Sequence, residues 1–266
     1  MEKNINLNYQ NMDYSDELQK KTKSKKYMNY DIISKENVTA NKLIIYIHGG
    51  GLIKGDKSSG SYLAKIALEE SVVVCLFNYP LTEEQVSENL VGLQIKCIDA
   101  GINKLLRTIQ YQIDDITIIG HSAGAYLAAL YVLKNTIYSE KLNLVLYDCA
   151  AYNLKEKFAR GTKKARERLT TIFRNVDRED VLRLYSPYHI ASLESKNPNA
   201  RWHFVSGKGE ATKYAAKTFS KVLETKKIYT KLYETNIEHD ELERFIDVEY
   251  LGKKLISSIL TNDKSI

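Results

Sequence analysis

The sequence predicts an α/β protein in which helices flank a mostly parallel central sheet. Short apolar segments rich in β-branched residues alternate with longer segments of helical periodicity. Several of the short segments are apolar almost throughout, which is typical of strands covered by helices on both faces. The sequence contains no internal repeat, no low-complexity linker and only 3 prolines. We therefore predict a single domain over residues 1–266.

Candidate strands and helices follow one another after a polar N-terminal arm, which we expect over residues 1–30. A capping box formed by Thr82 and Gln85 would open the second helix. The candidate strands cover residues 43–47, 72–77, 116–119, 142–147, 202–206 and 228–233, and the candidate helices cover residues 61–70, 84–108, 123–135, 211–225 and 240–259.

Residues 152–185 interrupt this alternation. They are charged and prone to form helix, and they contain too few apolar residues for a core strand. Because Gly161 and its polar neighbours interrupt the segment, we expect two short helices rather than a long one. The sequence therefore predicts a helical insertion over the end of the sheet.

The formal net charge of +6 is concentrated in two segments. Residues 155–183 contain 10 basic and 5 acidic side chains, and residues 1–26 contain 6 basic and 4 acidic ones. Few aromatic residues accompany these charges and no recognition module is visible, so we expect no nucleic-acid partner. Two interpretations of the insertion stay open, because it either attracts an anionic substrate or partner or forms an ordinary solvated helix surface.

Other classes of protein are excluded by simpler features. No apolar segment approaches the roughly 18 residues of a membrane span, and the first residues lack the apolar stretch of a secretory signal. We therefore expect a cytoplasmic protein. Cys75, Cys97 and Cys149 are too widely spaced for a disulfide framework and are expected to be buried. No two histidines share a helix face, so we expect neither a metal nor another cofactor.

The strongest functional motif is Gly120-His121-Ser122-Ala123-Gly124, which lies between a candidate strand and a helix. A serine on such a strand-to-helix turn needs small neighbours, because the backbone is strained and passes close to adjacent elements. The motif therefore predicts that Ser122 is a nucleophile.

A second glycine motif, His48-Gly49-Gly50-Gly51, also follows a candidate strand. Consecutive glycines let backbone N–H groups converge on an oxyanion, although the same arrangement also binds phosphate. The absence of a following Gly-Lys-Ser/Thr argues against a nucleotide.

Both motifs, together with Asn78-Tyr79-Pro80-Leu81-Thr82-Glu83, resemble the α/β-hydrolase superfamily over roughly residues 40–260. The similarity is to hormone-sensitive-lipase-like esterases and to small bacterial acetylesterases and formamidase-like hydrolases. The resemblance implies an α/β-hydrolase fold with residues 152–185 as its helical cap. It also implies that Gly50, Gly51 and Ala123 supply the oxyanion N–H groups. The family's usual Tyr-Arg-Leu-Ala-Pro is altered here to Tyr79-Pro80-Leu81-Thr82-Glu83.

The sequence has 5 histidines, and His239 is the predicted catalytic base. It follows the last candidate strand, where a hydrolase places its base. The resemblance gives His48 a loop-bracing role and His121 a packing role, and we expect His203 to be buried in a strand. His48, His121 and His189 are also our candidate substrate-binding residues.

The third member of the triad should be a carboxylate that orients His239. The resemblance places it after the strand that precedes the penultimate helix, where this chain has Glu210 in place of the usual Asp. Asp148 is the alternative, since it follows the 142–147 strand directly. We expect Glu238 and Asp240 to face solvent.

These residues predict a serine hydrolase that cleaves a small carboxylic ester through an acyl-enzyme. An amidase or acyltransferase would use the same residues, with an amide substrate or with an acceptor other than water. From a different class, a binding protein could retain the fold without turnover. The expected partner is a small ester or amide substrate, and its charge depends on which interpretation of the basic insertion holds.

Overall fold

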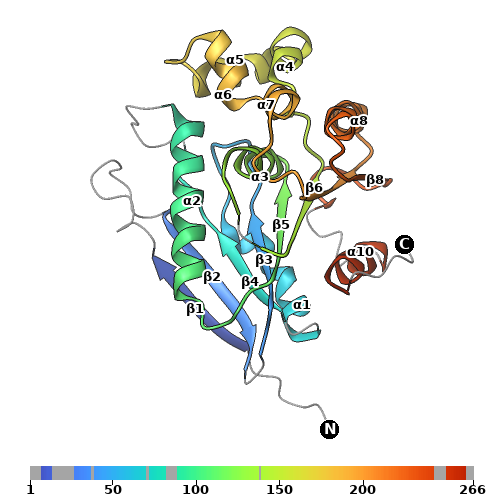
Figure 1. Cartoon of the computed structure of the whole chain (residues 1–266). Helices are drawn as coiled ribbons and strands as arrows, with labels where there is room; N and C mark the ends of the chain where they lie inside the picture. Colours follow the sequence, from blue (N-terminus) through green and yellow to red (C-terminus); the bar gives the residue numbers. More distant parts are fainter. Residues whose placement is uncertain are drawn as a thin grey trace.

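The computed structural model describes residues 7–13, 27–36, 39–69, 72–81, 89–137, 139–242 and 250–261. They form an eight-stranded sheet in the order β1-β2-β4-β3-β5-β6-β7-β8 (Figure 1). From β4 to β8 the neighbouring strands are parallel. The strands are β1 (Leu7–Asp13), β2 (Asn29–Lys35), β3 (Lys42–Ile47), β4 (Val73–Phe77), β5 (Asp115–His121), β6 (Lys141–Tyr147), β7 (Arg201–Ser206) and β8 (Thr230–Glu234).

The N-terminal edge of the sheet differs from the prediction. Within the arm expected over residues 1–30, the chain forms β1, and β2 begins at Asn29. Both strands run antiparallel to their neighbours. The sequence LNYQNMD of β1 lacks a long apolar run because an edge strand need not be buried on both faces. The polar composition of the arm therefore concealed an edge strand.

Helices cover both faces of the sheet, which explains why β3 and β4 are almost entirely apolar. Leu43, Ile45 and Ile47 pack in the core cluster formed with α2 (Leu90–Thr108), α3 (Ala123–Lys134), α7 (Pro187–Leu193) and α8 (Glu210–Thr225). Ile44 and Tyr46 point to the opposite face, where they pack with η2 (Lys57–Leu63), α1 (Ala64–Glu69) and α10 (Tyr250–Thr261).

Parts of two predicted helices fall on residues outside the described ranges. Thr82 and Gln85 of the expected capping box lie there, as does part of the helix expected over residues 240–259. In the described residues, α2 begins at Leu90 and Asn89 caps it by accepting a 2.7 Å hydrogen bond from the Gly92 N–H.

The insertion contains α4 (Leu154–Arg160), α5 (Lys163–Ile172) and α6 (Arg178–Tyr185). The sequence analysis predicted two helices here, but Asp177 starts a further one at α6. Leu154, Leu169 and Val181 are buried and join the main core, so apolar anchors hold these charged helices. Figure 1 shows the insertion above the edge at which the parallel strands end.

Candidate active site

Ser122 occupies a sharp turn between β5 and α3. Its backbone has φ 52° and ψ −111°, a conformation that L-residues rarely adopt. The Ser122 N–H donates a 2.8 Å hydrogen bond to the carbonyl oxygen of Tyr147, the last residue of the adjacent strand β6. This bond ties the turn to the sheet and presents the side chain above its carboxyl edge.

The glycines on either side of Ser122 allow this turn to form. A Cβ atom on Gly120 would lie 2.6 Å from Cα of Ala125. A Cβ atom on Gly124 would overlap the carbonyl oxygen of Ile47. Because the obstructing atoms are backbone atoms, no side-chain movement relieves either overlap. The Gly-x-Ser-x-Gly spacing is therefore required by close packing of the turn.

His239 lies in the loop after β8, as predicted, and its Nε2 is 3.1 Å from Ser122 Oγ. The ring of His121 packs beside it with the two centroids 4.9 Å apart. His121 Nε2 is 3.0 Å from the carbonyl oxygen of His239 and donates to it. His121, which is 5% exposed, therefore packs against His239 and holds the backbone of its loop.

The carboxylate partner of His239 is Asp148, which follows β6. Asp148 Oδ2 lies 2.6 Å from His239 Nδ1, and Asp148 Oδ1 accepts a 2.8 Å hydrogen bond from the Gly207 N–H. Burial raises the pKa of Asp148, but hydrogen bonds from His239, Thr212 and Gly207 outweigh burial and lower the pKa below its ordinary value. Because the carboxylate is ionised and can only accept, His239 Nδ1 carries the proton and Nε2 is free to accept from Ser122.

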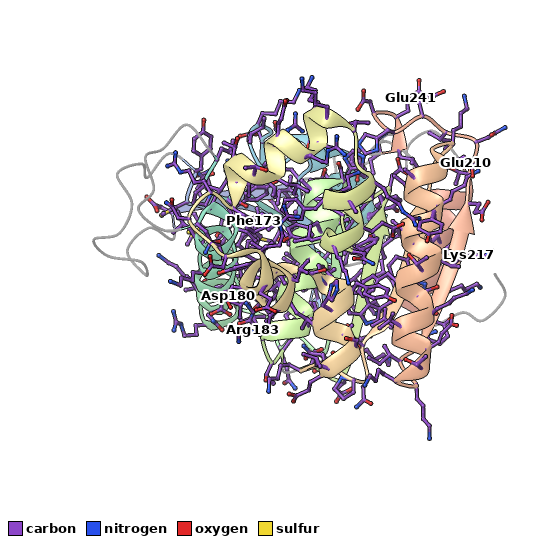
Figure 2. The ribbon with its side chains drawn as sticks, turned by 90° about the horizontal axis from the view of Figure 1, so that it is seen from above. Phe173, Asp180, Arg183, Glu210, Lys217 and Glu241 are labelled. Carbon is purple, nitrogen blue, oxygen red and sulfur yellow. The ribbon has the colours of Figure 1, made fainter. Side chains whose placement is uncertain are left out.

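Glu210, the acid that we expected, does not occupy this position. It is the first residue of α8, its side chain is 91% exposed, and its nearest ionic partner is Lys213 at 3.7 Å. Figure 2 shows Glu210 at the margin of the molecule, on the ribbon of α8. The alternative residue, Asp148, has a side chain only 2% exposed. Glu238 faces solvent, as predicted, and pairs with Lys208 at 2.8 Å.

The loop after β3 passes beside Ser122, and its glycines line the same hollow as this serine. Gly50 has φ 107°, Gly51 has φ 65° and Leu52 has φ 69°. Glycine suits the first position because a Cβ atom on Gly50 would overlap the carbonyl oxygen of Lys54. Within the described residues, the N–H groups of Gly50, Gly51 and Ala123 donate no hydrogen bond to the protein. These donors are therefore available to a bound molecule.

His48 braces this loop from inside the protein. Its Nδ1 lies 2.7 Å from the carbonyl oxygen of Gly49, and its ring stacks on Tyr79 with the centroids 4.2 Å apart. The Tyr79 hydroxyl donates a 2.8 Å hydrogen bond to the His48 carbonyl oxygen. With only 1% of its surface exposed, His48 does not line the open space beside Ser122. Its placement among the substrate-binding candidates was therefore wrong.

Gln94 is a further positioning residue, which the sequence analysis did not identify. Its Nε2 donates to the carbonyl oxygens of Leu52 at 3.1 Å and Pro80 at 2.7 Å. The residue is completely buried on α2 and so joins that helix to the loop after β3. A glutamine on the buried face of α2, within the sequence LVGLQIKCI, is the signal that could have revealed it.

The two remaining histidines lie away from Ser122. His189 Nδ1 is 2.8 Å from Ser186 Oγ, and among the described residues His189 lines neither of the hollows beside Ser122. Its assignment to substrate binding was therefore wrong. His203 is 3% exposed within β7, as predicted. Burial, with Arg201 and Lys231 nearby, lowers the pKa of His203 to about 3, so this histidine is neutral.

Two hollows meet at Ser122, and Gly51, Arg168 and His239 also line both of them. The first has a volume of about 290 Å³ and lies beneath α4 and α5, with Tyr126, Leu169 and Phe173 among its apolar walls. The second has a volume of about 540 Å³ and is more polar, with Lys54, Asp56 and Asp240 in its walls. The serine hydroxyl is therefore open to an apolar group on one side and to a polar group on the other.

Cys75, Cys97 and Cys149 are buried free thiols. In the described ranges, no group of three His, Cys, Asp or Glu side chains is arranged to hold a metal ion. Among the same residues, no helix has the length and apolar character needed to cross a membrane.

Comparison with known proteins places this geometry in a family. No curated protein matches the chain by sequence. Esterase B from Lactobacillus rhamnosis, in a structure with a tributyrin phosphonate, has a similar fold, with a TM-score of 0.76, 14% identity and coverage of 96% of this chain and 84% of that chain. An esterase from Pyrobaculum calidifontis has a TM-score of 0.67 at 14% identity, with coverage of 89% of this chain and 81% of that chain.

An esterase/lipase from an uncultured bacterium is also similar, with a TM-score of 0.65, 15% identity and coverage of 88% of this chain and 80% of that chain. These structures support the predicted α/β-hydrolase fold. The family model BD-FAE matches residues 30–221, which are most of the sheet, the two glycine motifs and the insertion. The chain therefore belongs to the BD-FAE family of α/β-hydrolase-like proteins.

Proposed function

We propose that this carboxylesterase-like protein hydrolyses a small carboxylic ester with Ser122 as nucleophile, His239 as base and Asp148 as the orienting acid. The observation that carries the proposal is the unbroken chain of hydrogen bonds from Ser122 Oγ through His239 to Asp148, with distances of 3.1 and 2.6 Å. Esterases among the structural neighbours support the same reaction class. In this proposal the acid is Asp148 and not Glu210, the residue expected from the sequence.

The first half of the reaction forms an acyl-enzyme. His239 Nε2 accepts the hydroxyl proton as Ser122 Oγ attacks the ester carbonyl carbon. The carbonyl oxygen becomes negatively charged, and the N–H groups of Gly50, Gly51 and Ala123 stabilise it. Asp148 remains ionised and stabilises the imidazolium of His239. The imidazolium then gives its proton to the departing alcohol oxygen as the carbon–oxygen bond breaks.

The second half releases the acid. Water loses a proton to His239 and attacks the acyl carbon, and the returning proton restores Ser122 when its bond to carbon breaks. The apolar hollow of about 290 Å³ suits a short acyl chain or a small ring. An amide substrate or an acceptor other than water would use the same groups, and a protein without turnover would retain only binding.

Covalent labelling tests the nucleophile directly. Wild-type protein should react with a fluorophosphonate at one site, Ser122, and should hydrolyse p-nitrophenyl acetate, whereas Ser122→Ala should do neither. If the wild-type protein is not labelled, the proposed serine-hydrolase activity is excluded. If Ser122→Ala is still active, Ser122 is not the nucleophile. A panel of matched esters and amides, each with and without an added alcohol acceptor, separates hydrolase from amidase and acyltransferase.

A further inference from the structure

Arg168 on α5 reaches down from the insertion to the loop that carries the oxyanion donors. A Cβ atom built on Gly51 would lie 2.5 Å from a terminal guanidinium nitrogen of Arg168. The guanidinium therefore lies directly over the backbone of Gly51. Arg168 also lines both hollows beside Ser122. A permanent positive charge thus stands where the two hollows meet.

This charge has no carboxylate partner within the described part of the chain. Two carboxylates that line the hollows are engaged elsewhere, since Asp148 bonds to His239 and Asp56 accepts from Asn78 at 3.1 Å and from the Ser58 N–H at 2.9 Å. Asp240 also lines the polar hollow, but no ion pair joins it to Arg168 among the described residues. Three other arginines of the insertion differ from Arg168 because each has a partner within the insertion. Arg160 pairs with Glu156 at 3.5 Å, Arg183 pairs with Asp180 at 2.8 Å, and Arg178 lies 3.7 Å from the Phe158 ring centroid.

The positions of the other basic residues show which charges of the insertion can reach a substrate at Ser122. Lys163, Lys164 and Arg166 are exposed, and among the described residues they line neither hollow at Ser122. Arg168, one turn along the same helix from Lys164, is also exposed but lines both hollows. Arg168 and Lys157 of the insertion therefore line the space at Ser122, and of these two Arg168 alone lines both hollows, whereas Lys163, Lys164 and Arg166 lie in solvent.

We propose that Arg168 is a specificity-determining residue that binds a carboxylate of the substrate. The inference rests on the proposed ester hydrolysis and names its substrate class as an ester that carries an apolar group and a carboxylate on opposite sides of the scissile bond. The apolar group fills the hollow beneath α4 and α5. The carboxylate lies in the polar hollow, where the planar guanidinium can donate two parallel hydrogen bonds to it.

Matched ester pairs test this inference. One pair is 3-carboxyphenyl butyrate and 3-carbamoylphenyl butyrate, which share a shape and differ in charge on the alcohol side. The other is the p-nitrophenyl monoester of adipic acid and p-nitrophenyl hexanoate, which differ in charge on the acyl side. For wild type and Arg168→Gln, kcat/KM is measured for all four. In at least one pair, we expect Arg168→Gln to lower the ratio of anionic to neutral kcat/KM about tenfold, while the neutral ester changes less than twofold.

Arg166→Gln is the matched control because it removes the same charge from the same helix outside the hollows. We expect it to change the ratio less than twofold, and we expect Arg168→Lys to restore part of the ratio. Unchanged ratios in both pairs would overturn the inference. Equal losses for neutral and anionic esters would also overturn it and would instead assign Arg168 to the oxyanion loop.

Binding to a protein without the nucleophile gives a readout independent of turnover. In a Ser122→Ala background, calorimetry with the four esters should show that Arg168→Gln weakens binding of an anionic ester about tenfold and leaves the neutral ester unchanged. If wild type cleaves no ester but this difference appears, the proposed function fails and the carboxylate site stands. If wild type cleaves the neutral esters and neither ratio responds to Arg168, the function stands and the site fails.

Discussion

The Asp148 carboxylate and the His239 ring are joined at 2.6 Å although 91 residues separate them in the sequence. Two neighbouring loops make this possible. Asp148 has φ 47° and its N–H bonds to the carbonyl oxygen of Val205 at 2.8 Å, so β7 holds it directly beyond the end of β6. The Gly207 N–H, just beyond β7, then orients the carboxylate toward His239.

We expect Asp148→Asn to lower kcat by about 10³- to 10⁴-fold with little change in KM. An amide can neither stabilise the imidazolium nor hold His239 Nδ1 as the proton donor, so the wrong tautomer faces Ser122. Steady-state kinetics with p-nitrophenyl acetate measures the effect. Glu210→Gln is the control for a lost carboxylate, and it should stay within about twofold of wild type. If Glu210→Gln lowered kcat more than Asp148→Asn did, Glu210 and not Asp148 would be the acid.

We expect Ala165→Leu to shift the protein toward shorter acyl chains. Ala165 lies on α5 and lines the apolar hollow, so a larger side chain takes up space that a longer chain needs. The kcat/KM ratio of p-nitrophenyl hexanoate to p-nitrophenyl acetate should fall about tenfold, within the range that a poor hydrophobic fit costs.

Lys164→Leu adds the same side chain to the neighbouring exposed position and should leave that ratio unchanged. If Ala165→Leu also left it unchanged, the acyl chain would have to occupy the polar hollow instead.

The buried His203 should make folding stability depend on pH. The pKa of His203 falls to about 3 in the folded protein because burial disfavours the charged ring and because Arg201 and Lys231 repel it. The unfolded chain therefore binds more protons between about pH 6.5 and pH 3, and stability falls as the pH falls through that range. Between pH 7 and pH 5 this residue should account for a loss of about 2 kcal/mol.

Urea unfolding of wild type and His203→Gln at both pH values measures this contribution. Comparing the change with pH, rather than stability at one pH, removes the packing cost of the substitution. His189→Gln should have a smaller effect, because His189 is only partly buried. An identical pH dependence for wild type and His203→Gln would show that His203 is not held neutral.

Short sequence motifs predicted the parts of the site that are built from neighbouring residues. Gly120 and Gly124 revealed the turn of Ser122 because only glycine fits against the backbone there. The acid could not be found in that way, because the choice between Glu210 and Asp148 depends on which loop packs beneath His239. Likewise, β1 is defined by its pairing with β2 rather than by its own composition. Arg168 has no sequence signature at all, since its role follows from the direction in which α5 faces.

The left-handed backbones of Ser122 and Asp148 stand at the ends of adjacent strands, and hydrogen bonds to Tyr147 and Val205 anchor them. In the proposed reaction, bond cleavage and substrate selection therefore belong to different parts of the molecule. On this proposal the sheet carries the groups that make and break bonds, and the surface helices α4 and α5 carry those that choose the substrate. Exchange of these helices between relatives would redirect the chemistry toward new esters while leaving the reacting groups in register.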